Sequence, residues 1–128
     1  MTTLCVVGSV WTAWTPEREV IVCQIIQVAY DLLRPALVIS GQSPGGGVDD
    51  WSEELAKAER IPFKGYPAEV NSWEGGESGH GYKWRNRLMA QHCTHLLAIR
   101  STTGHTYGSG WTADYAARIG RIVSVVML

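Results

Sequence analysis

Three stretches of the sequence combine glycine with hydroxyl or acidic residues, the residue types that commonly surround a bound phosphate. They are Gly8-Ser9, Gly45-Gly46-Gly47 with Asp49 close behind, and Gly108-Ser109-Gly110. Glycine lets the backbone approach a ligand closely and adopt positive φ angles. Two of the stretches lead into predicted helices, and the free amides and dipole at a helix start attract anions. One such loop is usually only a tight turn, but three that converge favour a ligand.

Side chains suited to the other parts of a nucleotide occur near these stretches. Arg85, followed by Asn86, would pair with a phosphate through two parallel N–H bonds, or would be a solvated helix charge. Trp73 would stack on a base or anchor its own loop. Asp49 would accept hydrogen bonds from a ribose or cap its helix, and these two roles are compatible. The sequence therefore offers groups for a phosphate, a base and a sugar.

Short apolar runs alternate with helical segments along the chain and determine where these residues lie. The runs predict strands at residues 4–7, 36–40, 61–66, 95–99 and 122–127. Thr15 is expected to cap the first helix, which begins at Pro16 and stops before Pro35. Asp50 and Glu53 form a predicted capping box for a second helix that reaches about residue 60. The remaining helices are predicted at residues 82–92 and 109–119.

This alternation from end to end predicts one domain, residues 1–128, with an α/β fold of Rossmann-like architecture. The expected structure is a three-layer sandwich whose five-stranded, mostly parallel sheet has the strand order 3-2-1-4-5. In such a sheet the binding crevice opens where the strand order reverses, between strands one and four. The loops after strands one, two and four should therefore gather at one edge, with the three glycine-containing stretches among them.

Composition and motifs argue against several classes of protein. A net charge of −1 argues against nucleic acid as the main partner, because neutralising phosphates needs a concentrated basic surface. No apolar run approaches the roughly 20 residues of a membrane helix, and the N-terminus lacks the pattern of a signal peptide. Neither the G-x-G-x-x-G of dinucleotide dehydrogenases, after the first strand, nor the G-x-x-x-x-G-K-[ST] of P-loop proteins is present.

The cysteines and histidines indicate a reducing compartment and no metal. Cys5 and Cys23 lie among apolar residues and make an odd number with Cys93, so we expect buried free thiols in a cytoplasmic protein. The four histidines match no zinc-binding pattern. His105, in the third of the glycine-containing loops, would contact a ligand or face solvent. No metal or other cofactor is therefore expected.

A series of short motifs runs through nearly the whole chain in a specific order and spacing. These motifs are Val7-Gly8-Ser9, Ile39-Ser40-Gly41, Gly46-Gly47-Val48-Asp49, Pro67-Ala68-Glu69, Trp73, Gly79, Arg85-Asn86-x-x-Met89, Thr106-Tyr107-Gly108-Ser109, Thr112, Tyr115-Ala116 and Gly120. Together they resemble the SLOG superfamily of Rossmann-like domains, specifically its YspA and cpYpsA-related branch. The resemblance implies a pocket for nucleotides or ligands made from them, and often a homo-oligomer. Two departures are the extra residues Gln42-Ser43-Pro44, which would reshape the pocket wall, and Ser109 in place of a threonine.

Better-characterised relatives in this superfamily, the LONELY GUY cytokinin-activating enzymes, are phosphoribohydrolases that split the N-glycosidic bond of a nucleotide. They pair an arginine with a glutamate three residues after their Gly-Thr pair. Arg85 matches that arginine, but Thr112 stands in the place of the glutamate. A neutral hydroxyl cannot act as a carboxylate base, so Glu74, Glu77 or Asp114 would have to substitute for it.

The sequence therefore predicts a module that senses, carries or sequesters a nucleotide or a nucleotide-derived small molecule. The alternatives, in order, are an N-glycosidase acting on a nucleoside monophosphate and a single-stranded nucleic-acid binder. Apolar and tryptophan-rich helix faces also predict a dimer or a larger homo-oligomer. Candidate catalytic residues are Arg85, Glu74 and Glu77. Candidate ligand-binding residues are Gly8, Ser9, Gly41, Gly46, Gly47, Asp49, Trp73, Arg85, Asn86, Gly108, Ser109 and Thr112.

Overall fold

A parallel sheet of five strands forms the centre of the computed structural model, which describes residues 1–103 and 107–128. The strand order is β3-β2-β1-β4-β5, and every neighbouring pair is parallel. The predicted order 3-2-1-4-5 is confirmed, with β1 and β4 side by side where the order reverses. The strands are β1 (Thr3–Gly8), β2 (Leu37–Ser40), β3 (Phe63–Gly65), β4 (His95–Arg100) and β5 (Ile122–Met127).

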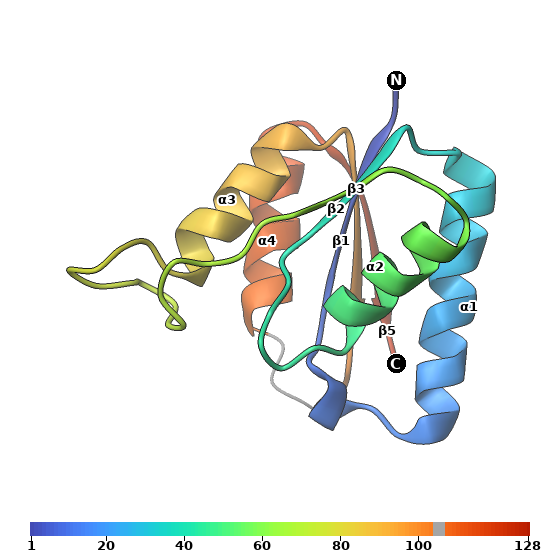
Figure 1. Ribbon diagram of the computed structural model, residues 1–128, viewed down its shortest axis with the longest axis horizontal. Coiled ribbons are helices and arrows are strands. Elements are labelled where there is room, and N and C mark those ends of the chain that lie inside the picture. Colours follow the sequence, from blue (N-terminus) through green and yellow to red (C-terminus); the bar gives the residue numbers. More distant parts are fainter. Residues whose placement is uncertain (104–106) are drawn as a thin grey trace.

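Helices cover both faces of this sheet (Figure 1). The helices α1 and α2 pack together on one face, and α3 and α4 pack together on the other. This is the predicted three-layer, Rossmann-like arrangement. The helices are α1 (Pro16–Leu33), α2 (Val48–Ala58), α3 (Tyr82–His92) and α4 (Tyr107–Arg118), with a short 3-10 helix η1 (Trp11–Ala13) after β1.

The strand β1 supplies alternate side chains to the two halves of the core. Leu4 and Val6 pack with the apolar residues of the α1 face, among them Val22. Cys5 packs on the opposite face with Met89 of α3. A parallel strand buried on both faces is expected to divide its side chains in this way. The core therefore fixes β1, and with it the residues that follow its end, against both helix layers.

The first helix begins as predicted, and the second does not. Thr15 Oγ1 accepts a hydrogen bond of 3.2 Å from the Arg18 N–H, which caps α1. The N-cap of α2 is Gly47, with a φ of +72° and no side-chain capping bond. A Cβ on Gly47 would lie 2.5 Å from the backbone nitrogen of Trp11, so this turn has no room for a side chain. A close approach of two loops therefore determines where α2 starts.

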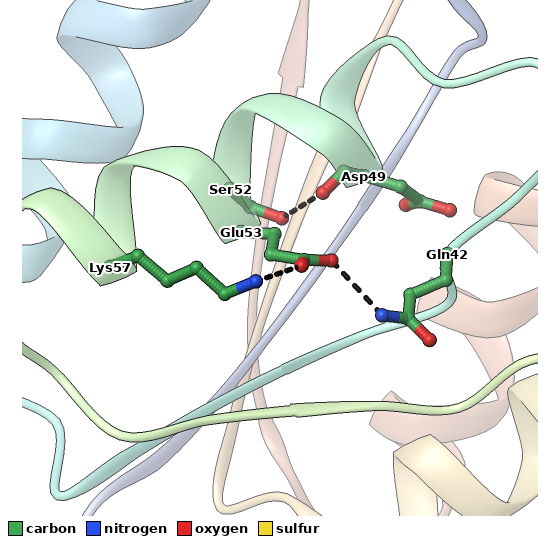
Figure 2. A network of polar contacts seen from close by, with 5 residues as sticks. All are labelled: Gln42, Asp49, Ser52, Glu53 and Lys57. Carbon is green, nitrogen blue, oxygen red and sulfur yellow. Dashed lines mark hydrogen bonds and ion pairs between the residues drawn. The ribbon is translucent and has the colours of Figure 1, made fainter.

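The capping box predicted from Asp50 and Glu53 is wrong for the same reason. Because α2 begins at Val48, Glu53 lies further inside the helix than the position from which a side chain could reach back to the N-cap. Its carboxylate instead accepts hydrogen bonds from Gln42 Nε2 and Lys57 Nζ (Figure 2).

Other element boundaries shift by a few residues. Helix α4 begins at Tyr107, earlier than the predicted residue 109, so Gly108 and Ser109 belong to its first turn. Strand β3 is shorter than the predicted residues 61–66. Cys5 and Cys93 are buried free thiols, whereas Cys23 is only partly buried. In the part of the chain that the structure describes, no helix has both the length and the apolar character to cross a membrane.

Gly47→Ala is expected to lower the free energy of unfolding by about 1–3 kcal/mol, because a side chain disfavours this backbone conformation and meets the Trp11 backbone. Urea unfolding measures the loss. Gly76→Ala is the matched control, since a Cβ there has nothing within 4 Å. Equal losses for the two variants would show that the turn before α2 does not require glycine.

Candidate functional site

A cavity of about 380 Å³ lies at the carboxyl ends of the strands, where the sheet order reverses. Residues after β1 and β2, the long segment before α3, and the first turns of α2, α3 and α4 all contribute to its wall. This volume is within the range of small-molecule sites. The lining residues are Val7, Gly8, Val10, Ser43, Pro44, Gly45, Asp49, Trp73, Tyr82, Arg85, Asn86, Met89, Tyr107, Gly108 and Ser109.

One end of the cavity is formed by the start of α4. Tyr107 and Gly108 are the first residues of this helix, and both line the cavity. The first amides of an α-helix have no intrahelical acceptor, and the helix dipole adds partial positive charge at this end. Thr112 is fully buried, and its Oγ1 donates a 2.6 Å hydrogen bond to the Gly108 carbonyl, which fixes the turn. The turn is thus a suitable place for an anion.

Arg85 is only 5% exposed, and most of its donors are used within the protein. Nε donates to Asn86 Oδ1 at 2.6 Å, and Nη1 donates to the carbonyls of Gly41 and Tyr66. Nη2 donates a long bond of 3.4 Å to Ser43 Oγ. A guanidinium has five N–H donors, so within the described residues one N–H on Nη2 is left for a ligand. Burial lowers the pKa of Arg85, and the charge of Asp49 opposes that change.

Asp49 supplies the one carboxylate among the described residues of the cavity wall. Its oxygens accept hydrogen bonds of 3.1 Å from Ser40 Oγ and from the Ser43 amide, and the carboxylate points away from the axis of α2 (Figure 2). Burial raises the pKa of Asp49, although these hydrogen bonds and the charge of Arg85 act in the opposite direction. The capping role predicted for Asp49 is wrong, because Gly47 is the N-cap of α2.

Aromatic rings make up another part of the wall. Trp73 meets Tyr107 edge-on, with ring centroids 5.1 Å apart, and meets Trp111 in the same way at 5.3 Å. The Arg85 guanidinium lies over the Tyr82 ring, with Arg85 Cζ 5.1 Å from the ring centroid. Trp73 therefore anchors its own loop and also presents a surface to the cavity, so the two predicted roles are compatible.

The structure brings seven of the predicted ligand-binding residues to one cavity and places five outside its wall. The residues on the wall are Gly8, Asp49, Trp73, Arg85, Asn86, Gly108 and Ser109. The residues outside it are Ser9, Gly41, Gly46, Gly47 and Thr112.

The residues outside the wall support the ones that line it. The Ser9 hydroxyl accepts a hydrogen bond from the Ser101 amide, and the Ser9 carbonyl accepts one from the Trp14 indole N–H. The Gly41 carbonyl accepts a hydrogen bond from Arg85 Nη1, and a Cβ on Gly41 would lie 2.6 Å from that nitrogen. The loops that the motifs mark therefore meet at this cavity, but several of their residues support its wall rather than line it.

Sequence reasoning missed some of the lining residues. Tyr82 and Met89 line the cavity with Arg85, and the spacing of these residues places them on one face of α3. That spacing was available in the sequence. Of the extra residues after β2, Ser43 and Pro44 line the cavity, whereas Gln42 points to Glu53.

The acids considered as catalytic substitutes lie elsewhere. Neither Glu74, Glu77 nor Asp114 lines the cavity. Glu74 forms an ion pair of 3.6 Å with Lys83. Residue His105 lies outside the described residues. Among the residues that are described, no group of three histidine, cysteine or acidic side chains could hold a metal ion.

Comparisons with known proteins support the fold. No protein-family model matches this sequence, and no curated protein matches it. One solved structure with this fold is that of TM1055, a structural-genomics target studied by X-ray crystallography. The two chains are 15% identical with a TM-score of 0.69, over 96% of this chain and 72% of TM1055. At this identity the likeness shows the Rossmann-like α/β fold alone.

The raised pKa of Asp49 predicts the sign of a pH dependence. The folded protein holds this proton more tightly than the unfolded chain does. The folded state therefore loses stability as pH rises from the ordinary pKa of 3.8 through the raised pKa. Asp49→Asn cannot titrate and lacks this loss. The free energy of unfolding of the wild type, minus that of the variant, should therefore fall as pH rises across this window. A difference that rises instead would mean that the charge of Arg85 outweighs burial.

Proposed function

We propose that this protein binds a nucleotide or a nucleotide-derived small molecule in the cavity at the strand ends and leaves it unchanged. The observation that carries the proposal is the combination of a helix start, one remaining Arg85 N–H and aromatic rings around one cavity. The helix start and the guanidinium suit a phosphate, and the rings suit a base. The resemblance of the sequence motifs to the nucleotide-binding SLOG superfamily supports the same ligand class.

Two observations favour binding over hydrolysis of the N-glycosidic bond. Thr112 occupies the position of the glutamate of the phosphoribohydrolases, and it is buried with its hydroxyl bonded to Gly108. Asp49 lines the cavity, but its carboxylate accepts bonds from Ser40 and Ser43. A general base needs an oxygen within hydrogen-bond reach of the attacking water. Hydrolysis would have to use Asp49 as its base. Because this carboxylate lines the cavity, hydrolysis remains the second candidate function.

Gly108→Ala tests the site with little change to the fold. The nearest atoms to an added Cβ are Trp73 Cζ3 at 3.6 Å and Asn86 Nδ2 at 3.7 Å, and alanine is a better helix former than glycine. The methyl group would project beside the amide expected to meet the phosphate. We expect binding of the best ligand from a panel of 5′-AMP, NAD and ADP-ribose to weaken by about tenfold, or ~1.4 kcal/mol.

Thermal shift and calorimetry measure this effect, followed by mass analysis of the recovered ligand. Gly76→Ala, a glycine-to-alanine change away from the cavity, should bind like the wild type. Unchanged affinity in Gly108→Ala would show that the ligand does not bind at the start of α4. Recovery of free base and sugar phosphate would establish the hydrolase instead.

We also propose that the protein is a homo-oligomer that uses the outer face of α1. Val20, Ile21, Val28 and Leu32 are 57%, 42%, 55% and 78% exposed, and their helical spacing places them on one face. Light scattering should give a mass above 14.1 kDa for the wild type and a lower mass for Val28→Glu. A monomeric wild type would contradict this proposal.

A further inference from the structure

A second hollow, of about 540 Å³, lies over α3 and α4 and shares no lining residue with the first cavity. Its residues come from α3, from α4 and from the segment that precedes α3. The two hollows adjoin through aromatic rings, because Trp73 lines the first, Trp111 lines the second, and these rings meet edge-on. We call the second hollow the α3/α4 groove.

Two aromatic stacks line the α3/α4 groove. The rings of His80 and Trp84 are 4.2 Å apart and within 13° of parallel, and Trp84 remains 43% exposed. The rings of Trp111 and Tyr115 are 5.4 Å apart and within 3° of parallel. An exposed aromatic face can stack on the flat face of a heteroaromatic ring, and this stacking does not depend on which substituents the ring carries. Both stacks are therefore possible platforms for such a ring.

Cations lie beside these platforms. Glu74 pairs with Lys83 and offsets its charge, which leaves Arg87 and Arg118 as the net positive charge of the groove. Arg87 donates from Nε to Tyr115 Oη at 3.3 Å, and its guanidinium lies 5.6 Å from the centre of that ring. Its terminal nitrogens are not used in this bond, so they can donate to an anion. Arg118 is exposed on the same groove.

We propose that the α3/α4 groove is a second binding site, for a planar heteroaromatic ring that carries a phosphate. The aromatic stacks bind the ring, and Arg87 and Arg118 bind the phosphate. A free nucleotide and a single strand of nucleic acid both have this chemistry. The site is separate from the cavity at the strand ends, and it does not depend on what that cavity binds.

The test follows the indole N–H signals of Trp84 and Trp111 by NMR, assigned with Trp84→Phe and Trp111→Phe. The probes are adenosine, 5′-AMP and a short single-stranded oligodeoxyadenylate. Each titration is repeated in Gly108→Ala, so that a failure of the first cavity is seen separately. We expect 5′-AMP to shift both signals at a several-fold lower concentration than adenosine. That advantage should disappear in the variant that combines Arg87→Ala with Arg118→Ala, and it should persist in Lys57→Ala on the opposite helix layer.

The two sources of the ligand are separated by the oligonucleotide. Binding of the strand at least tenfold tighter than 5′-AMP would assign the groove to single-stranded nucleic acid, and equal affinity would assign it to free nucleotides. Indole signals that stay unmoved by all three probes at millimolar concentration would overturn the proposal. So would equal shifts with adenosine and 5′-AMP. If none of the probes shifts the indole signals and Trp84→Ala has a lower light-scattering mass than the wild type, the groove is a contact between copies of the chain.

Discussion

The buried guanidinium of Arg85 joins the elements that form the site. Its bonds to the carbonyls of Gly41 and Tyr66 tie α3 to the residues that follow β2 and β3. A Cβ built on Gly41 would lie 2.6 Å from Arg85 Nη1 and 3.2 Å from Asp49 Oδ2, so both side chains pack against this glycine. Loss of the Arg85 side chain would leave these carbonyls without their donor, and an unsatisfied buried polar group costs about 1–3 kcal/mol. The cavity therefore depends on this arrangement for its shape as well as its charge.

This constraint limits what Arg85 can do for a ligand. With most of its donors bonded to the protein, the side chain cannot form the two parallel bonds to a phosphate that its residue type first suggested. In the proposed binding mode the start of α4 is then the larger contributor to anion binding, because its first turn lines the same cavity. Asp49 is similarly tied to Ser40 and Ser43, which favours a site that holds a ligand over one that cleaves it.

The fold and the gathering of these loops around one cavity could be predicted from the sequence, whereas the position of each side chain could not. The strand order follows from the alternation of apolar runs and helical segments, because parallel strands need crossover connections of fixed hand. The start of α1 follows from local chemistry at Thr15 and Pro16. The start of α2 does not, since it depends on the approach of Gly47 to Trp11, a contact between distant parts of the chain.

The same limit applies within the site. A loop motif shows that residues gather at the strand ends, but it does not show which side chains point inward. Ser9 and Thr112 have residue types suited to ligand binding, and both instead satisfy backbone groups behind the wall. Tyr107 belongs to one of the motifs but was not among the predicted ligand-binding residues, because its place on the wall follows from where α4 begins.

The most direct test of the central claim is the backbone amide spectrum of the protein during titration with 5′-AMP and ADP-ribose. If the cavity at the strand ends binds the phosphate through the start of α4, the Gly108 amide and the Arg85 side-chain signals should show the largest shifts. Shifts confined to other parts of the chain, or none at saturating concentrations of either ligand, would contradict this account.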